Sequence, residues 1–145
     1  MRTACHQPPP ARHNGFTLVE LAIAASIAVL MMSMAWPSYQ TRLAKVRRAD
    51  AIQALTQVQL AQEQFRAVNG SYAASLAQLR GAGMSRSPQG LYEIVLEDAA
   101  AESYGAVARA RPEAAQAHDQ DCPWLALRVD QGVSEKTPSA ACWNL

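Results

Sequence analysis

The stretch NGFTLVE, residues 14–20, opens the longest apolar run of the chain and places a carboxylate inside it. Phe16 to Trp36 is 21 residues long with Glu20 as its one charge, and roughly 20 apolar residues suffice for a helix to cross a bilayer. A charge within such a helix costs a few kcal/mol. We therefore expect a membrane-spanning helix in which Glu20 makes a contact that offsets this cost.

A cleaved secretory signal is the alternative interpretation of this segment. Signal peptides have an apolar core of about 7 to 15 residues followed by a small-residue cleavage site, whereas this run is longer and leads into a helical pattern after Ser38. The membrane helix is therefore favoured. Pro37 lies at its end, and because proline cannot donate to the carbonyl of Ser33, we predict a helix kink there.

The cysteines and the flanking charges disagree about orientation. Cys122 and Cys142 lie 20 positions apart in a segment rich in turn formers, as a disulfide in an oxidising compartment would be; two buried free thiols in a reduced domain are the alternative. Counting charges instead puts the far flank in the cytoplasm, because two arginines precede the apolar run and four cations follow it. The four are Arg42, Lys45, Arg47 and Arg48.

Helical patterning continues over residues 38–69. An apolar stripe follows the 3.6-residue period, while Lys45 and Arg48 fall outside it, and Ile52 and Leu60 are apolar residues off the stripe that are either ordinary surface residues or contacts to another copy. Asn69-Gly70 predicts a left-handed helix stop. The stripe comprises Tyr39, Leu43, Val46, Ala54, Val58, Ala61, Phe65 and Val68.

Residues 70–91 are rich in serine and glycine and predict a connecting loop with one helical turn at Leu76 to Leu79. Short runs with strand character follow. Alternation along residues 124–130 makes one strand face apolar, so we expect an antiparallel sheet packed against the stripe of the long helix, an α+β fold. The expected strands are residues 91–97, 104–111, 124–130 and 133–136.

These residues together resemble the type IV pilin family. The match rests first on Gly15 to Glu20 and the apolar stretch that ends in Trp36-Pro37-Ser38-Tyr39-Gln40. Three later features are similar to PilE-type minor pilins in particular. They are Gln62-Glu63-Gln64-Phe65, Asn69-Gly70-Ser71-Tyr72, and the pair Cys122 and Cys142-Trp143.

The resemblance implies the type IV pilin fold, in which the second half of a long N-terminal helix packs on a small antiparallel sheet. It also implies that a prepilin peptidase cuts between Gly15 and Phe16 and N-methylates Phe16. Glycine suits such a site because it restricts the backbone least. The expected parts are a leader (1–15), a transmembrane and filament-core helix (16–37), its amphipathic continuation (38–69), a connecting loop (70–91), and a sheet with a disulfide-closed C-terminal loop (92–145).

A role in subunit assembly explains Glu20 on this interpretation. After cleavage it sits in the first turns of the helix, where the backbone dipole favours an anion, and it would pair with the cationic amine of Phe16 on another subunit. Such a pair relieves two charges in an apolar filament core. The alternative is a helix-capping glutamate at the headgroup level.

Catalytic, cofactor and metal sites are not expected. The sequence lacks a phosphate-binding glycine loop, HExxH and paired CxxC motifs, and His118 is the one histidine after residue 15. The run from His118 to Asp121 offers oxygen ligands for calcium, but we interpret its two aspartates as solvated. Asn69-Gly70-Ser71 matches a glycosylation acceptor, but the helix stop explains it without a glycan.

The function expected from these features is that of a structural minor subunit of a type IV pilus, which supports pilus assembly, adhesion or twitching motility. Its partners would be other pilins, the prepilin peptidase, the inner-membrane assembly platform and, before assembly, membrane lipid. The C-terminal domain would be periplasmic and later part of the surface pilus.

Two other functions remain open. One is a type II secretion pseudopilin, although the terminal cysteine pair favours the pilus. The other is a DNA-uptake receptor pilin, which is less favoured because six basic and nine acidic residues follow residue 68. A local patch would still reach phosphate. Its candidates are Arg80, Arg86, Arg109, Arg111 and Lys136. We interpret the four cations of residues 42–48 as facing headgroups or acids of neighbouring subunits.

Overall fold

The computed structural model describes residues 17–79 and 84–145. It contains one long helix, α1 (Leu18–Asn69), followed by a four-stranded antiparallel sheet, which is the expected α+β fold. By its internal contacts the chain divides into two units, Met1–Pro37 and Ser38–Leu145.

The described part of the first unit is the apolar half of α1. Its side chains are all exposed, and the helix is long and apolar enough to cross a membrane. The hydroxyls of Ser26 and Ser33 donate to backbone carbonyls of the preceding turn, at 2.8 Å each, so neither needs a partner outside the helix. α1 is continuous through Pro37, and a kink there stays a prediction.

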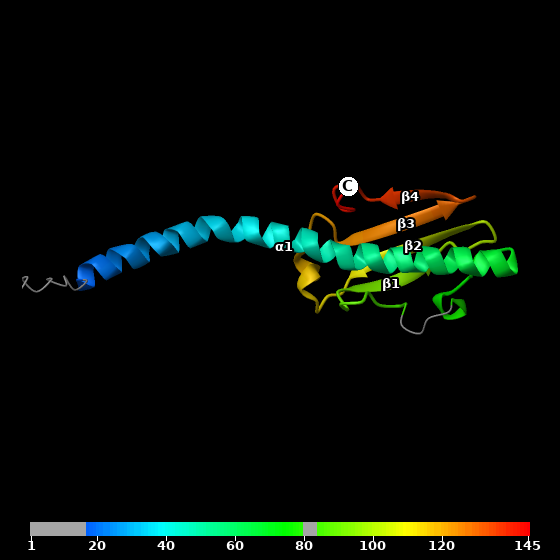
Figure 1. The fold of residues 1–145 in the computed structure, drawn as a ribbon, viewed down its shortest axis with the longest axis horizontal. Coiled ribbons are helices and arrows are strands. Elements are labelled where there is room, and N and C mark those ends of the chain that lie inside the picture. The colour runs from blue at the N-terminus through cyan, green and yellow to red at the C-terminus, as the bar shows by residue number, and fades with distance from the viewer. Residues whose placement is uncertain (1–16, 80–83) are drawn as a thin grey trace, which may run out of the picture. The chain divides into compact units, whose positions relative to one another are not determined.

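The second unit places the other half of α1 along one face of the sheet (Figure 1). The strands lie in the order β1-β2-β3-β4, so each strand pairs with its neighbour in sequence. Their positions agree with the predicted runs to within one residue at each end. The bounds are β1 (Tyr92–Glu97), β2 (Ser103–Ala110), β3 (Trp124–Asp130) and β4 (Val133–Thr137).

The hydrophobic core lies between this half of α1 and the inner face of the sheet. Alternate strand residues point inward, which is the pattern expected of an antiparallel sheet with one covered face. On the helix the core residues are Ala51, Ala54, Leu55, Val58 and Ala61. On the sheet they are Tyr92, Ile94, Tyr104, Ala106, Ala108, Leu125, Leu127 and Val129.

The predicted apolar stripe of α1 was partly wrong. Tyr39, Val46 and Val68 are 60%, 70% and 85% exposed, whereas Arg48 and Asp50 are buried. The buried face of the helix includes polar residues that have partners on other elements. The contact face therefore keeps the middle of the predicted stripe, at Ala54, Val58 and Ala61, but excludes both of its ends.

The end of α1 follows the prediction. The helix stops at Asn69, and Gly70 adopts a positive φ of 76° while its N–H donates to the carbonyl of Arg66 at 2.8 Å. The buried amide of Gln62 then exchanges two hydrogen bonds with the backbone of Ala73. This exchange holds the connecting loop against the helix, and the predicted helical turn is the 3-10 helix η1 (Leu76–Gln78).

Candidate functional site

The first candidate site is the N-terminal motif, of which the structure describes only part. Gly15 and Phe16 lie outside the described residues. Glu20 stands in the first turn of α1, and its N–H donates to the hydroxyl of Thr17 at 3.2 Å. Thr17 thus caps the helix, a role that the sequence analysis missed although the spacing Thr-x-x-Glu signals it.

A buried ion pair joins α1 to the loop that follows β2. Arg48 and Asp119 form a bidentate pair in which Nε and Nη2 each donate to a carboxylate oxygen at 2.7 Å. Their side chains are 2% and 3% exposed. Two interpretations of the sequence were therefore wrong. Arg48 pairs with an acid of its own chain and faces neither headgroups nor a neighbouring subunit, and Asp119 is not solvated.

Further hydrogen bonds hold this pair in place. Asp119 also accepts from the side-chain amide of Gln116 at 2.6 Å and from the N–H of Cys122 at 3.3 Å. The hydrogen bonds to Asp119 raise the pKa of the Arg48 guanidinium. Burial raises the pKa of the neighbouring Tyr92. The network fixes the loop containing the 3-10 helix η2 (Ala115–His118) against α1.

The C-terminal segment is anchored to the same region. A disulfide joins Cys122 to Cys142, with their Cα atoms 5.7 Å apart, so the predicted pairing is present. The indole N–H of Trp143 donates to the carbonyl of Thr137 at 2.8 Å, and the Lys136 ammonium lies 5.2 Å from the centre of the Trp143 ring. Lys136 is thus engaged with its own C-terminus.

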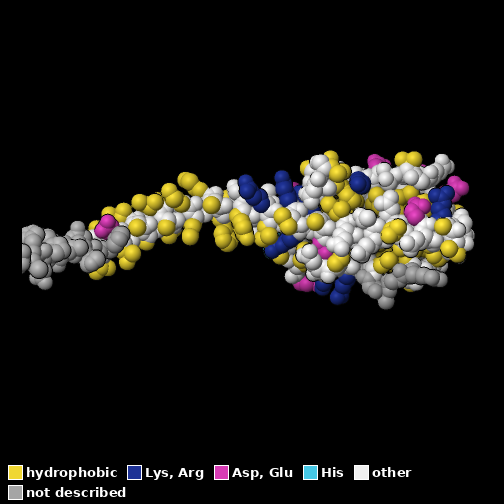
Figure 2. Space-filling model, viewed as in Figure 1, with side chains coloured by type: hydrophobic (Ala, Val, Ile, Leu, Met, Phe, Trp, Pro, Cys, Tyr) yellow, Lys and Arg dark blue, Asp and Glu magenta, His cyan; other side chains and the backbone are white. Residues whose placement is uncertain are grey.

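Five basic residues come from the start of the second unit's part of α1 and from the segments tied to α1 at Asp50, and we call them the cationic end. Several Lys and Arg side chains gather where α1 enters this unit (Figure 2). Two residues of the predicted DNA patch flank the start of β1, because Arg86 lies opposite Glu93 in a β-bridge and the Arg111 N–H donates to the carbonyl of Leu91 at 3.0 Å. Arg80 lies outside the described residues. The cationic end comprises Arg42, Lys45, Arg47, Arg86 and Arg111.

A tight turn at residues 87–90 lies within the cationic end. The N–H of Gln89 donates to the carboxylate of Asp50 at 2.8 Å, which ties the turn to α1 one turn beyond Arg47. Arg111 donates to the carbonyl of Gly90 at 3.0 Å, and Gly90 has a φ of 71°. Pro88 and the side chain of Gln89 are exposed. The turn is therefore rigid at its base and open at its tip.

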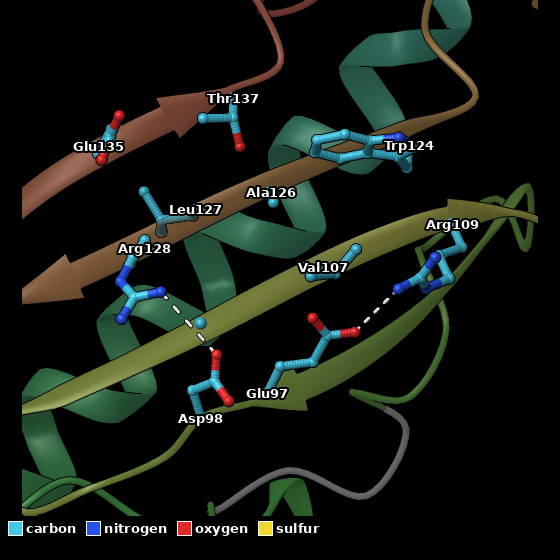
Figure 3. A pocket seen from close by; sticks show the side chains of 11 residues that line it. Glu97, Asp98, Val107, Arg109, Trp124, Ala126, Leu127, Arg128, Glu135 and Thr137 are labelled. Carbon is cyan, nitrogen blue, oxygen red and sulfur yellow. Dashed lines mark hydrogen bonds and ion pairs between the residues drawn. The ribbon is translucent and has the colours of Figure 1, made fainter.

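A shallow groove of about 510 Å³ lies on the outer face of the sheet, the face away from α1 (Figure 3). Val107, Ala126 and Trp124 form its apolar part. Arg109 takes part in this surface and pairs with Glu97 at 2.9 Å. It lies opposite Glu93, and Glu93 lies opposite Arg86, so these two arginines of the predicted DNA patch share the outer face. Among the described residues, no group of three or more His, Cys, Asp or Glu is placed to hold a metal ion.

The helix with its exposed apolar half and the antiparallel sheet packed on its other half define a type IV pilin. Comparison with known families agrees. The prokaryotic N-terminal methylation motif matches residues 10–36, and the family described as type IV minor pilin ComP, DNA uptake sequence receptor, matches residues 37–126.

The chain belongs to this ComP family of type IV minor pilins. No individual curated protein matches it. The finer resemblance to PilE-type pilins stays a prediction. Pilins are structural subunits that assemble with other pilins, and the methylation motif with its apolar helix fits anchoring in the inner membrane before assembly.

Proposed function

We propose that this minor pilin is a DNA-binding subunit of a type IV pilus and that its cationic end contacts the phosphate backbone. The observation that carries the proposal is the family match, since the matched family is described as a DNA uptake sequence receptor and the match covers residues 37–126. The sequence alone favoured a purely structural pilus subunit, because the overall charge after residue 68 is acidic. DNA binding instead requires only a local basic surface.

The geometry of the cationic end supports phosphate contacts. Arg42, Lys45 and Arg86 are exposed, and no ion pair to an acid of this chain is found for them among the described residues. Cations of this kind release counterions from DNA and supply affinity that depends on salt but not on sequence. Arg111 contributes less, because it pairs with Glu113.

The turn at residues 87–90 supplies a candidate for sequence reading. Its base is held by Asp50 and Arg111, while the side chain of Gln89 is exposed. A glutamine amide can donate to and accept from the edge of adenine in the major groove. Arg86 would thus position the duplex, and Gln89 would favour particular bases.

Assembly completes the proposal. The precursor is cut between Gly15 and Phe16 by a prepilin peptidase, Phe16 is methylated, and Glu20 pairs with that amine on a neighbouring subunit. The globular unit is periplasmic while the chain waits in the inner membrane, and the assembly platform then adds the chain to a surface pilus. Mass spectrometry of sheared filaments tests these steps together, because it reports the presence of the subunit, its mature N-terminus and its methylation.

DNA binding is tested with the full-length protein in detergent micelles and a labelled duplex of about 20 base pairs. Arg86→Gln is expected to weaken binding to all sequences and to reduce the slope of log affinity against log salt by about 1. The matched control is Arg128→Gln, which makes the same charge change in the row of Glu97, four residues along β1 from the row of Arg86, and should leave binding unchanged.

Gln89→Ala separates base reading from phosphate binding in the same assay. It is expected to keep the salt slope and to flatten the preference among duplexes of different sequence. Equal effects of the two arginine variants would show that only bulk charge matters. Absence of duplex binding at low salt would leave a structural pilin without a DNA role.

A further inference from the structure

The outer face of the sheet has an apolar row between charged rows. The strand register places Val95, Val107, Ala126 and Thr137 side by side across all four strands. Val95 and Trp124 are 37% and 36% exposed, which is high for large apolar side chains on a sheet. At about 4.8 Å between strands the row is roughly 14 Å long, which corresponds to about four residues of extended chain.

Gly105 and an ion pair keep one side of this row open. Gly105 lies between Glu97 of β1 and Arg128 of β3, and Arg128 reaches across it to Asp98 at 3.9 Å (Figure 3). A Cβ atom at Gly105 would lie 3.2 Å from the carbonyl oxygen of Glu97. A side chain at this position would therefore crowd β1 and fill the space beneath the pair.

The charges around the row are predominantly negative. The outer face and its edge carry five carboxylates against three guanidinium groups, a net formal charge of 3 − 5 = −2. Arg109 pairs with Glu97 and Arg128 with Asp98, and Arg86 lies opposite Glu93 in a β-bridge. The acids are Glu93, Glu97, Asp98, Asp130 and Glu135.

We propose that the outer face binds an extended segment of another protein that carries lysine or arginine on both sides of an aliphatic side chain. The aliphatic group covers the apolar row, and the cations meet Asp130 and Glu135, two carboxylates for which no ion pair is found among the described residues. Charge complementarity disfavours DNA here, because phosphate would approach a surface with two excess negative charges. This site adjoins the cationic end, since Arg86 lies opposite Glu93, but it does not depend on the DNA proposal.

The test uses the full-length protein in detergent micelles and a fluorescein-labelled nonapeptide in which lysine alternates with valine or leucine. Fluorescence anisotropy gives its affinity. Ala126→Gln puts a polar side chain into the apolar row and is expected to weaken binding at least fivefold. Glu135→Lys is expected to do the same. The matched control is Glu102→Lys, the same charge change in the turn before β2, with an expected change of less than twofold.

Several results would overturn the proposal. These are failure of the parent protein to bind the peptide, equal binding of a peptide with serine in place of its aliphatic residues, and equal losses in Glu102→Lys and Glu135→Lys. Weaker duplex DNA binding in Ala126→Gln would identify nucleic acid as the occupant. If sedimentation shows that the parent protein dimerises and that Ala126→Gln does not, the occupant of the face is a second copy of this chain. Thermal melts confirm that each variant is folded.

Discussion

The two halves of α1 belong to one continuous helix but meet different surroundings. Between Leu18 and Pro37 every side chain is exposed within the chain, whereas the half after Ser38 buries a face against the sheet. The first half is apolar all round, as a helix in lipid or a filament core is expected to be. Its partners must therefore come from outside the chain, while the second half finds its partners within it.

Polar residues follow the same division. In the second half Arg48, Asp50 and Gln62 are buried, and each has a hydrogen-bond partner on another element. In the first half Glu20 bonds only through its backbone, to Thr17 of its own helix turn, among the interactions of the described residues. We therefore expect substitution of Glu20 to impair filament assembly, and substitution of Arg48 to lower the stability of the globular unit.

The largest expected effect is that of Glu20→Gln on filament entry. If Glu20 interacts only with the helix dipole, its charge stabilises the helix by about 0.3–1 kcal/mol. If it pairs with the amine of Phe16 on another subunit, the substitution leaves that buried cation unpaired, at a cost of about 3–5 kcal/mol. We expect the variant to be cleaved and held in the membrane, with its filament-to-membrane ratio reduced at least tenfold, which is equivalent to about 1.4 kcal/mol.

Glu63→Gln is the matched control for this prediction, because it makes the same charge change in the second half of the helix. Quantitative immunoblots of sheared pili and membranes measure both ratios in one strain. An unchanged ratio for Glu20→Gln would assign Glu20 to helix capping.

The next largest effect is that of Arg48→Ala on the stability of the globular unit. The substitution leaves Asp119 buried without its cation, and breaking buried pairs in this way costs about 3–5 kcal/mol. Urea unfolding of the full-length protein in micelles, followed by tryptophan fluorescence, measures the loss. Arg128→Ala is the control, since its pair with Asp98 is exposed and is worth about 1 kcal/mol at most.

The double variant Arg48→Ala/Asp119→Ala sharpens this result. If the cost arises from an unpaired buried charge, removal of both partners should destabilise the protein less than Arg48→Ala alone. Equal losses in the single and double variants would assign the cost to packing instead.

The disulfide is expected to contribute somewhat less to the free energy of unfolding than the pair of Arg48 and Asp119. Closing the loop between Cys122 and Cys142, whose sequence separation is 20, is worth about 3 kcal/mol on the chain-entropy model. Replacement of both cysteines by serine should lower the free energy of unfolding by about that amount. Thiol labelling of the denatured, unreduced parent should find no free thiol at either position. Quantitative labelling of both would show that the bond does not form in the cell.

Local patterns predicted most of this fold. The helix stop at Asn69-Gly70 depends on one backbone conformation, and the alternation in residues 124–130 depends on a period of two, so both are legible in a short window. The pair of Arg48 with Asp119 is not, because 71 positions separate the two residues. Because charged residues are usually exposed, both Arg48 and Asp119 were predicted to lie on the surface.

The candidate DNA surface shows the same limit. Arg86 and Arg111 were identified by residue type, but they were grouped with Arg109 and Lys136. Sheet pairing keeps Arg109 on the face of Arg86, because both lie opposite Glu93, and separates Lys136, which covers Trp143. Residue types indicated that the surface is basic, but which basic residues share a face depends on how the strands pair.

The smallest expected effect is that of Tyr104→Phe. The Tyr104 ring is 1% exposed and packs edge to face on Tyr72 with ring centres 4.8 Å apart, yet its hydroxyl has no hydrogen-bond partner among the described residues. Removal of a buried hydroxyl that makes no bond should change the free energy of unfolding at pH 7 by about 1 kcal/mol at most, in either direction.

The variant should differ more clearly at alkaline pH. Burial raises the pKa of Tyr104 in the folded state, so near pH 10 the unfolded chain releases this proton while the folded chain keeps it. The folded state then binds more protons, and stability falls as the pH rises. Half a unit above the unfolded pKa this loss is about 0.8 kcal/mol for one tyrosine. Urea unfolding at pH 7 and pH 10.5 should therefore show a smaller loss in Tyr104→Phe than in the parent. Equal losses would mean that Tyr104 ionises equally in both states, and that the core between α1 and the sheet is open to solvent at this position.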